Sequence, residues 1–294
     1  MMRGLAEFIM RGRWQALGVA VLGSGSLLFG WVSAAAIALV TLRNGSASGG
    51  WLTLWAILPA IIIAAISGDT GSVLLLLGTF SLAVILRESV SLSLAVMASV
   101  PLALLGGAAL TLFNGVFLQE LVATFNQALA QLEQELAQGE AAEMVFNAVS
   151  VPQVAALLAT GNAVIALLSL ILGRYWQASL YNPGGFGEEF RALRLPVGAV
   201  LLMASTALIL WWMGADWRVW SAVVVLPLTV VGFSLLHAFA KRAGKGVTWL
   251  ALMYALWIVI DPVKWLWVGC VVIDTFADVR GRWSRSADQG PGGD

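Results

Sequence analysis

The stretch NPGGFGEEFRALRLP, residues Asn182–Pro196, is a polar segment between two apolar runs that still carries a helical pattern. Its apolar residues recur at steps of four and three, which places Phe186, Phe190 and Leu193 on one helical face. Most of the charged residues take the other face (Glu188, Glu189, Arg191, Arg194). The stretch is entered through Pro-Gly-Gly and ends at Pro196, residues that interrupt helices. The pattern predicts a short amphipathic helix at a membrane surface, and a solvated loop between two transmembrane helices is the alternative.

The composition places this stretch in a membrane protein. The chain has 294 residues, of which 60% are apolar and 11% charged, and its mean hydropathy is +0.89. Soluble domains are nearer half apolar and a quarter charged. Several runs of about 20 residues carry no charge, which is long enough to cross the hydrocarbon core. We therefore expect an all-α polytopic membrane protein in a lipid bilayer, with one integral membrane domain over 1–283 and a disordered tail over 284–294.

The first apolar run, Trp14–Leu42, decides how the remaining segments are oriented. It contains no charge, but Gly23-Ser24-Gly25-Ser26 and Gly30 interrupt it. It is interpreted either as one long helix or as a hairpin of segments near 14–28 and 31–42. With the hairpin, the chain has ten apolar segments, near 14–28, 31–42, 51–66, 73–86, 90–113, 152–173, 197–213, 219–240, 247–260 and 263–276.

The distribution of Lys and Arg favours the hairpin. With the N terminus inside, 14 of the 16 basic residues fall on the inner side, and only Arg218 and Lys264 fall outside. Acidic residues divide 8 and 8, so the inner side carries six excess positive charges. A single crossing at Trp14–Leu42 removes most of this bias, which membrane proteins normally show. The count therefore predicts a multi-pass protein with both termini in the cytoplasm.

Several segments are short for a full crossing. A 12-residue helix is about 18 Å long, against roughly 30 Å of hydrocarbon. We expect shortened or re-entrant helices at 31–42, 73–86 and 247–276, although a full crossing stays an alternative because sidedness does not separate the two.

The region 116–149 is predicted to be an acidic amphipathic insertion outside the membrane. Its apolar residues form a helical stripe (Phe117, Leu121, Phe125, Ala128, Leu132, Leu136), and its glutamates come without Lys or Arg. The stripe is expected to pack on the membrane or on neighbouring helices, with a partner-binding helix as the alternative. Ser150-Val-Pro-Gln153 then has the pattern of a helix N-terminus with a capping box.

Polar residues near the outer boundary are the candidates for a ligand site, because intramembrane polar groups are costly. Asp216 and Arg218 lie among tryptophans, and Asp261 and Lys264 lie at the tip of the last hairpin. A local Asp261–Lys264 ion pair and a tryptophan belt at the interface are the alternatives. The candidate ligand-binding residues are Asp69, Trp212, Asp216, Trp217, Arg218, Asp261 and Lys264.

Candidates for contact with a protein partner come from two other patterns. Ala34 and Ala38 form a small-residue pair of the kind that lets helices approach closely. Phe186, Phe190, Arg191 and Arg194 belong to the amphipathic stretch already described. His237 and the group Asp274, Asp278 and Arg280 are interpreted as structural residues and ion pairs near the inner boundary.

Enzyme signals are mostly absent. The sequence has no His-Glu-x-x-His motif, phosphate-binding loop or nucleotide-binding domain, and its single cysteine excludes an intramolecular disulfide and a multi-cysteine metal site. We expect no catalytic residues, metal, cofactor or nucleic-acid partner.

Four stretches together resemble the YybS-like family of bacterial inner-membrane proteins, a domain of unknown function: AEFIMRGR (6–13), WVSAAAIALVTLR (31–43), Asn182–Pro196 and the group Asp274, Asp278 and Arg280. That family is considered distantly similar to the S-components of energy-coupling-factor transporters. The resemblance implies a subunit that binds a small ligand from outside and docks on a coupling subunit. S-components usually have about six helices, so ten segments depart from that pattern.

The sequence therefore favours an uncharacterised, non-catalytic transport-type subunit in the bacterial inner membrane. The alternative is a membrane assembly or regulatory factor that acts through protein contacts.

Overall fold

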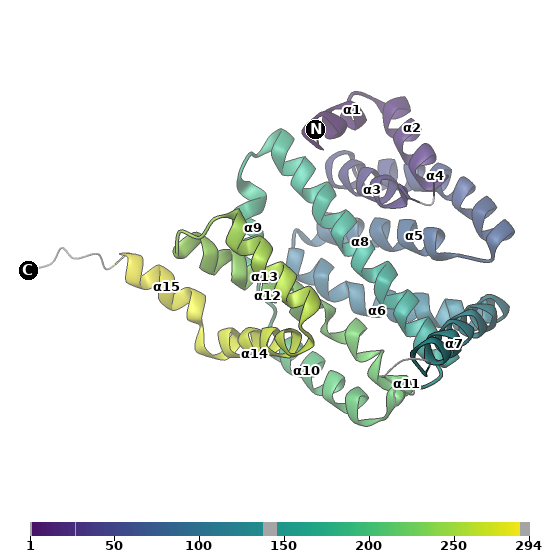
Figure 1. The fold of residues 1–294 in the computed structure, drawn as a ribbon. Helices are drawn as coiled ribbons and strands as arrows, with labels where there is room; N and C mark the ends of the chain where they lie inside the picture. Colours follow the sequence, from purple (N-terminus) through teal and green to yellow (C-terminus); the bar gives the residue numbers. More distant parts are fainter. Residues whose placement is uncertain (1, 27, 138–145, 289–294) are drawn as a thin grey trace, which may run out of the picture.

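The computed structural model describes residues 2–26, 28–137 and 146–288, and all regular structure in that part of the chain is helical (Figure 1). The first half forms α1 (Met2–Met10), α2 (Arg13–Ser24), α3 (Gly30–Asn44), α4 (Ser46–Ser67), α5 (Gly71–Ser89), α6 (Leu92–Phe113), α7 (Gly115–Ala137) and α8 (Val151–Tyr181). The second half forms α9 (Gly185–Ala192), α10 (Val197–Trp212), α11 (Ala215–Arg218), α12 (Ser221–Arg242), α13 (Val247–Val259), α14 (Asp261–Ala277) and α15 (Val279–Asp288).

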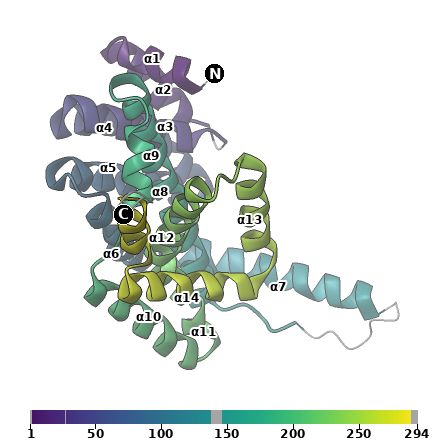
Figure 2. The same ribbon diagram turned by 90° about the vertical axis from the view of Figure 1, so that its left-hand side faces the viewer.

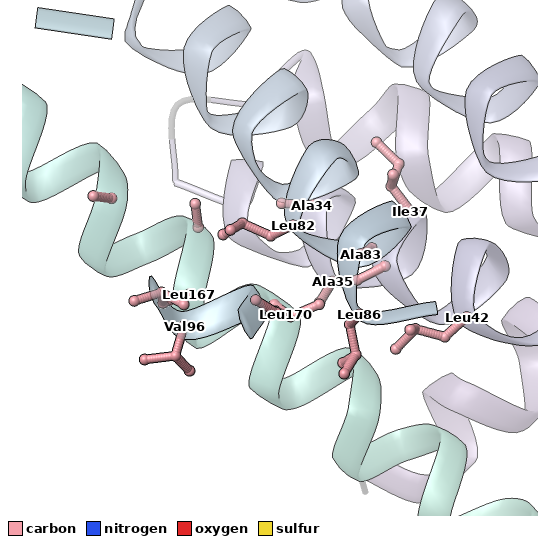
Figure 3. Packing of buried hydrophobic residues seen from close by; sticks show 14 of the residues in the cluster. Ala34, Ala35, Ile37, Leu42, Leu82, Ala83, Leu86, Val96, Leu167 and Leu170 are labelled. Atoms are coloured by element: carbon pink, nitrogen blue, oxygen red, sulfur yellow. The ribbon is translucent and has the colours of Figure 1, made fainter. Parts of the chain in front are cut away.

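Helix α3 is the centre of the N-terminal half. Every residue from Ser33 to Leu42 is buried, and α2, α4, α5 and α8 all pack against this helix. Figure 3 shows its side chains among those of α5, α6 and α8. A helix that is buried on all sides needs small side chains where its neighbours approach, and α3 supplies a run of alanines over 34–36.

The small-residue pair Ala34 and Ala38 belongs to this core. Both residues are fully buried, and a Cβ atom added to Gly173 of α8 would lie 2.7 Å from the Ala38 Cβ atom. The predicted partner contact at Ala34 and Ala38 is therefore corrected to a contact inside the chain, because helices of the same chain already cover both side chains.

The interpretation of Trp14–Leu42 as a hairpin is confirmed. Helix α2 ends at Ser24 and α3 begins at Gly30, and the two helices pack against each other. The Ser33 hydroxyl donates a hydrogen bond of 2.7 Å to the carbonyl oxygen of Ala20, which joins the two arms. The glycine-rich sequence thus marks the break between the two helices.

Five helices are long and apolar enough to cross a membrane: α4, α5, α6, α8 and the α11–α12 segment Ala215–Arg242. Two bent pairs raise the number to seven if each pair makes one span: α9 with α10, at 65°, and α13 with α14, at 114°. These helices, judged by length and composition, fit a multi-pass membrane protein. The ten predicted segments are not confirmed.

The three segments predicted to be short differ in outcome. Over 73–86 the helix is longer than expected, because it continues through Arg87 and Glu88, and the 19 residues of α5 fit the alternative of a full crossing by length and composition. Helix α3 stays short, with 15 residues. Over 247–276 the chain forms α13 and α14, which meet at a steep angle (Figure 2) and make a broken span or a re-entrant loop.

Contacts between helix ends gather many of the basic residues at one end of the fold, which we call the basic end. Arg87 and Gln177 both donate to the carbonyl oxygen of Leu42, and Arg43 lies 3.9 Å from the centroid of the Tyr181 ring. Arg174 pairs with Glu189. Arg280 of α15 likewise reaches the end of α9 through the Arg191 carbonyl.

The insertion 116–149 contains α7, which packs beside α6 and α8 and then extends away from them (Figure 2). Leu118 is buried with Leu110 and Val154, whereas Phe125 and Leu132 farther along the predicted stripe are exposed. The stripe therefore packs on neighbouring helices over its first part. Residues 138–145, which include the predicted helix end near Gly139, lie outside the described residues.

The capping box before α8 is present: Ser150 Oγ accepts a hydrogen bond from the Gln153 backbone N–H, and Gln153 Oε1 accepts one from the Ser150 N–H. At the other end of the chain, α15 continues to Asp288 and so overlaps the stretch expected to be a disordered tail. Residues 289–294 lie outside the described part.

Candidate functional site

The residues predicted to bind a ligand at the outer boundary take several separate local roles. Asp69 Oδ1 accepts a 2.7 Å hydrogen bond from the Gly71 N–H. Asp216 accepts one of 2.6 Å from the Ser150 hydroxyl. Asp261 and Lys264 form a 2.6 Å ion pair, as the local alternative predicted.

The tryptophans of this group are exposed. Two of its cations lie near rings of a neighbouring helix: Lys264, whose Nζ atom lies 5.8 Å from the centroid of the Trp257 ring, and Arg218. Its guanidinium lies 4.4 Å from the ring centroid of Trp211, which is in edge contact with Trp265 of α14. Trp212 is 83% exposed and Trp217 about half exposed. The hydrogen bonds of Asp69 and Asp216 go to Gly71 and Ser150, and neither contact joins one of these carboxylates to another of the seven candidates.

A cavity of about 640 Å³ lies at the opposite, basic end of the fold. Residues of α8, α9, α12 and α13 line it, and its aromatic members are Tyr175, Phe186, Phe190, His237 and Tyr254. Its volume falls within the range of roughly 300–1,000 Å³ that is usual for small-molecule sites. We call it the aromatic cavity.

The rings of the aromatic cavity form a continuous series. Successive centroids lie 6.3 Å apart from Tyr175 to Phe186, 5.8 Å to Phe190, 5.4 Å to His237 and 5.9 Å to Tyr254. Three of these four contacts are edge-to-face, with interplanar angles of 76°, 85° and 64°. Edge-to-face packing is the arrangement that aromatic quadrupoles prefer, so the rings support one another.

Helix α9 places two of these rings by its sequence. Gly184 has φ of +89°, a left-handed conformation that favours glycine, and α9 begins at the next residue. Phe186 and Phe190 are four residues apart, so they share one face of α9 and lie one turn from each other. The amphipathic pattern of Asn182–Pro196 thus predicted the helix correctly.

His237 has one ring nitrogen engaged. Its Nδ1 atom lies 2.8 Å from the carbonyl oxygen of Phe233, one turn earlier in α12. A carbonyl accepts only, so Nδ1 carries the proton in this contact. In the neutral ring, Nε2 is then left as a hydrogen-bond acceptor. Glu188 and Arg191 also line the cavity, so it offers both signs of charge beside its rings.

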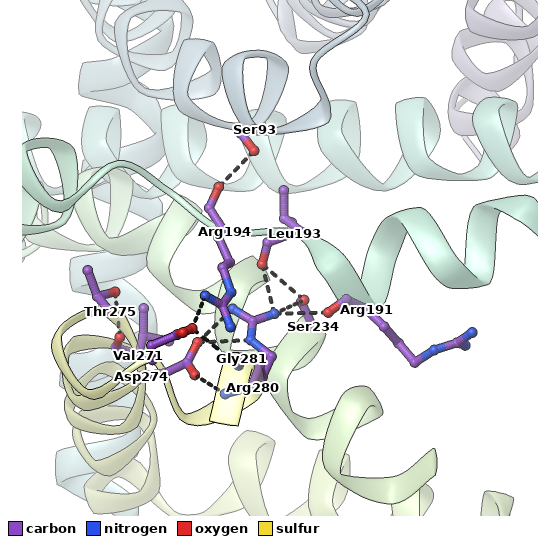
Figure 4. Close-up of polar contacts among 11 residues, drawn as sticks. Ser93, Arg191, Leu193, Arg194, Ser234, Val271, Asp274, Thr275, Arg280 and Gly281 are labelled. Atoms are coloured by element: carbon purple, nitrogen blue, oxygen red, sulfur yellow. Dashed lines mark hydrogen bonds and ion pairs between the residues drawn. The ribbon is translucent and has the colours of Figure 1, made fainter. Parts of the chain in front are cut away.

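A buried ion pair holds this region together (Figure 4). Arg280 Nη2 lies 2.8 Å from Asp274 Oδ2, and the two side chains are 8% and 4% exposed. Arg280 Nη1 also donates to the carbonyl oxygens of Arg191 and Leu193 and to the Ser234 hydroxyl, at 2.9–3.0 Å. Burial lowers the pKa of Arg280 from its ordinary value, and the hydrogen bond with Asp274 opposes that shift.

The arginine of this ion pair also holds the segment between α9 and α10 in place. Arg280 ties the C-terminal end of α9 to α12 and to the junction of α14 with α15, and Arg194 forms a further 2.5 Å ion pair with Asp278. The predicted ion pairing at Asp274, Asp278 and Arg280 is therefore confirmed. Of the residues predicted to contact a partner, Arg194 instead pairs within the chain, whereas Phe186, Phe190 and Arg191 line the aromatic cavity.

Sequence reasoning identified Phe186 and Phe190 but did not assign Tyr175 or Tyr254, and it interpreted His237 as structural. The sequence signal for His237 was its position near the predicted inner boundary, one turn before Lys241 and Arg242. Rings and charged groups around a preformed cavity are suited to binding and orienting a small molecule. Within the described residues, no group of three or more His, Cys, Asp or Glu side chains could hold a metal ion.

Comparison with protein-family models, curated proteins and solved structures finds no match for this chain.

Proposed function

We propose that this protein is a non-catalytic, transport-type membrane subunit that binds a small ligand in the aromatic cavity. The observation that carries the proposal is this cavity of about 640 Å³, with five aromatic or imidazole rings supplied by four helices. Short and broken helices around it, α9 with α10 and α13 with α14, support the same function. Interrupted helices in membrane proteins commonly line substrate sites, because non-helical backbone must face protein or a cavity.

The side chains that line the aromatic cavity indicate which kind of ligand it would bind. Ring faces and edges suit an apolar or aromatic body, and His237 Nε2 suits a ligand group that donates a hydrogen bond. Glu188 and Arg191 suit a polar or charged end. The ligand we propose is therefore a small molecule with a ring and a polar substituent.

The setting that we propose follows the sequence. The protein lies in a bacterial inner membrane with both termini in the cytoplasm, belongs with the YybS-like proteins, and docks on a coupling subunit that supplies energy. With that orientation, the aromatic cavity lies toward the cytoplasmic side, which differs from the outer ligand site that the sequence favoured.

The test is purification of the full chain from native membranes in mild detergent, followed by mass spectrometry of retained small molecules and co-purifying proteins. The cavity variant is Phe186→Ala, and its control is Phe276→Ala, because Phe276 is exposed on α14 and does not line the cavity. Trp212→Ala and Asp216→Ala test the candidate ligand-binding residues at the outer boundary. We expect wild-type protein and Phe276→Ala to retain the same molecule and Phe186→Ala to lose it.

Loss of the molecule in Trp212→Ala or Asp216→Ala, with Phe186→Ala unchanged, would instead place the ligand at the outer boundary. No retained molecule and no coupling subunit would overturn the transport proposal.

The alternative function is an assembly or regulatory factor, and the exposed part of α7 favours it. Phe125 and Leu132 carry apolar surface beyond the part of α7 that packs on α6 and α8. If this function is correct, Phe125→Glu abolishes co-purification of a non-transport complex while the protein stays folded. Unchanged co-purification would exclude α7 as the contact.

A further inference from the structure

A second cavity, of about 430 Å³, opens at the basic end where α5, α8 and α9 meet the end of α3. Its lining differs from that of the aromatic cavity, because it consists largely of charged and polar side chains: Arg87, Glu88, Arg174, Gln177 and Glu189. We call it the polar cavity. Helices α5 and α8, two of the helices long enough to cross a membrane, contribute four of these residues near their C-terminal ends.

The two arginines of the polar cavity are held in place by contacts within the chain. Arg87 Nη1 donates to the carbonyl oxygens of Thr41 and Leu42, at 3.3 and 2.7 Å. Arg174 Nη1 donates to Gln177 Oε1 at 3.1 Å. These contacts use one nitrogen of Arg87, and its Nε and Nη2 atoms form no hydrogen bond or ion pair with other described residues. The guanidinium is thus oriented while part of its donor capacity is unused.

The two glutamates bring an equal negative charge. Glu88 Oε1 accepts a 2.7 Å hydrogen bond from the Ser46 hydroxyl, and Glu189 Oε2 lies 2.6 Å from Arg174 Nη2. That Glu189 oxygen is buried without a hydrogen bond of good geometry, although it belongs to the ion pair. The charged lining therefore sums to zero, with two cations and two anions around one space.

This balance selects the class of ligand. A simple anion would lie near two carboxylates, and a simple cation near two guanidinium groups, so each would meet like charge. A zwitterion avoids both costs, since its phosphate can accept hydrogen bonds from arginine and its ammonium can donate to carboxylates. We propose that the polar cavity binds a headgroup that carries both a phosphate and a primary ammonium.

The rim of the polar cavity points to a lipid as the source. Val90 lines it, is 86% exposed and has φ of +53°, a left-handed conformation that is strained for a β-branched residue. Such strain often occurs where a chain clamps a ligand. An apolar side chain beside a polar space matches a phospholipid whose headgroup enters the cavity and whose acyl chains leave across Val90. Pockets between membrane helices that contain basic residues bind the phosphates of lipid headgroups.

The experiment measures lipid retention by native mass spectrometry. The purified full chain is exchanged into detergent that contains equal amounts of phosphatidylethanolamine, phosphatidylcholine and phosphatidylglycerol. The second lipid keeps the charge but lacks ammonium N–H donors, and the third lacks the ammonium. We expect preferential retention of phosphatidylethanolamine. Free glycerophosphoethanolamine is added in a parallel sample: displacement of the lipid shows that the site also takes the headgroup from water, and no displacement shows that it requires the lipid.

Two variants test the assignment of charges. Arg87→Gln should weaken retention of phosphatidylethanolamine about tenfold, the effect of losing one charged hydrogen bond. Glu88→Gln, at an exposed position, should reduce the preference over phosphatidylglycerol by a similar factor. Arg3→Gln is the matched control, because Arg3 is exposed and pairs with Glu7 of the same helix.

Unfolding temperatures of all three variants show whether each is folded. Equal retention of the three lipids by wild-type protein would overturn the proposal. So would retention by folded Arg87→Gln and Glu88→Gln that equals retention by Arg3→Gln. The result does not depend on the ligand of the aromatic cavity, so the two proposals stand or fall separately.

Discussion

Replacement of Gly173 by alanine should destabilise the contact on which the N-terminal half depends. Gly173 lies where α8 crosses α3, and a Cβ atom there would come within 2.7 Å of the Ala38 Cβ, 3.0 Å of the Ala35 carbonyl oxygen and 3.0 Å of the Leu39 nitrogen. Two of these three atoms belong to the backbone of a buried helix. They cannot move aside as the end of a flexible side chain can, so α8 must move away from α3.

The change in the free energy of unfolding is the difference between the cost of overpacking and the gain in helix propensity. Overpacking a tight contact costs about 1–3 kcal/mol, and a backbone clash on two atoms belongs at the upper end of that range. Alanine is favoured over glycine inside a helix by about 1 kcal/mol. Gly173→Ala should therefore lower the free energy of unfolding by about 2 kcal/mol.

Gly161 provides a matched control on the same helix. A Cβ atom at Gly161 meets no atom within 4 Å. Gly161→Ala therefore gains the higher helix propensity of alanine without a clash, and it should raise the free energy of unfolding by up to about 1 kcal/mol. Reversible unfolding of both variants in mixed micelles, followed by circular dichroism, measures the difference, which we expect to be about 3 kcal/mol. Equal stabilities for the two variants would refute the close approach of α8 to α3.

Three further substitutions test other contacts. Asp274→Asn should lower the free energy of unfolding by about 3 kcal/mol, because it leaves the buried Arg280 cation without its partner; unchanged denaturant unfolding would contradict this. Gly232→Ala should displace Trp267, whose ring lies 2.0 Å from a Cβ atom built there, and the shift in tryptophan fluorescence reports whether α14 separates from α12; an unaltered spectrum and stability would contradict the close contact between Gly232 and the Trp267 ring. Ser150→Ala should cost about 1 kcal/mol through loss of the N-cap of α8, and thermal unfolding measures it; full stability would show that the cap contributes little.

The candidate site illustrates where sequence reasoning stops. The pattern of Asn182–Pro196 was sufficient to predict α9, because apolar spacing and helix-breaking residues act locally. Phe190 contacts His237 on the later helix α12, and His237 in turn contacts Tyr254 on α13. No periodicity in α9 specifies which helix will cover it, so the same rings were assigned to an external partner.

The candidate ligand-binding residues at the outer boundary show a second limit of sequence reasoning. Asp216, Arg218 and Asp261 share a boundary in the topology, and from that they were predicted to share a site. Each has a contact close by instead: Asp216 with the cap of α8, Arg218 with Trp211 and Asp261 with Lys264. Location at one boundary does not fix lateral position, which depends on how the helices are arranged around one another.

The sequence by itself determined that the chain is helical and fits a membrane, that Trp14–Leu42 turns back at its glycines, and that α8 begins with a cap at Ser150. These properties depend on hydropathy, local backbone preference and hydrogen bonds between near neighbours. Only the tertiary structure decided that α3 is buried on all sides and that α8, α9, α12 and α13 line one cavity. Those features result from side-chain packing between segments far apart in the chain, and packing is specified by shape rather than by periodicity.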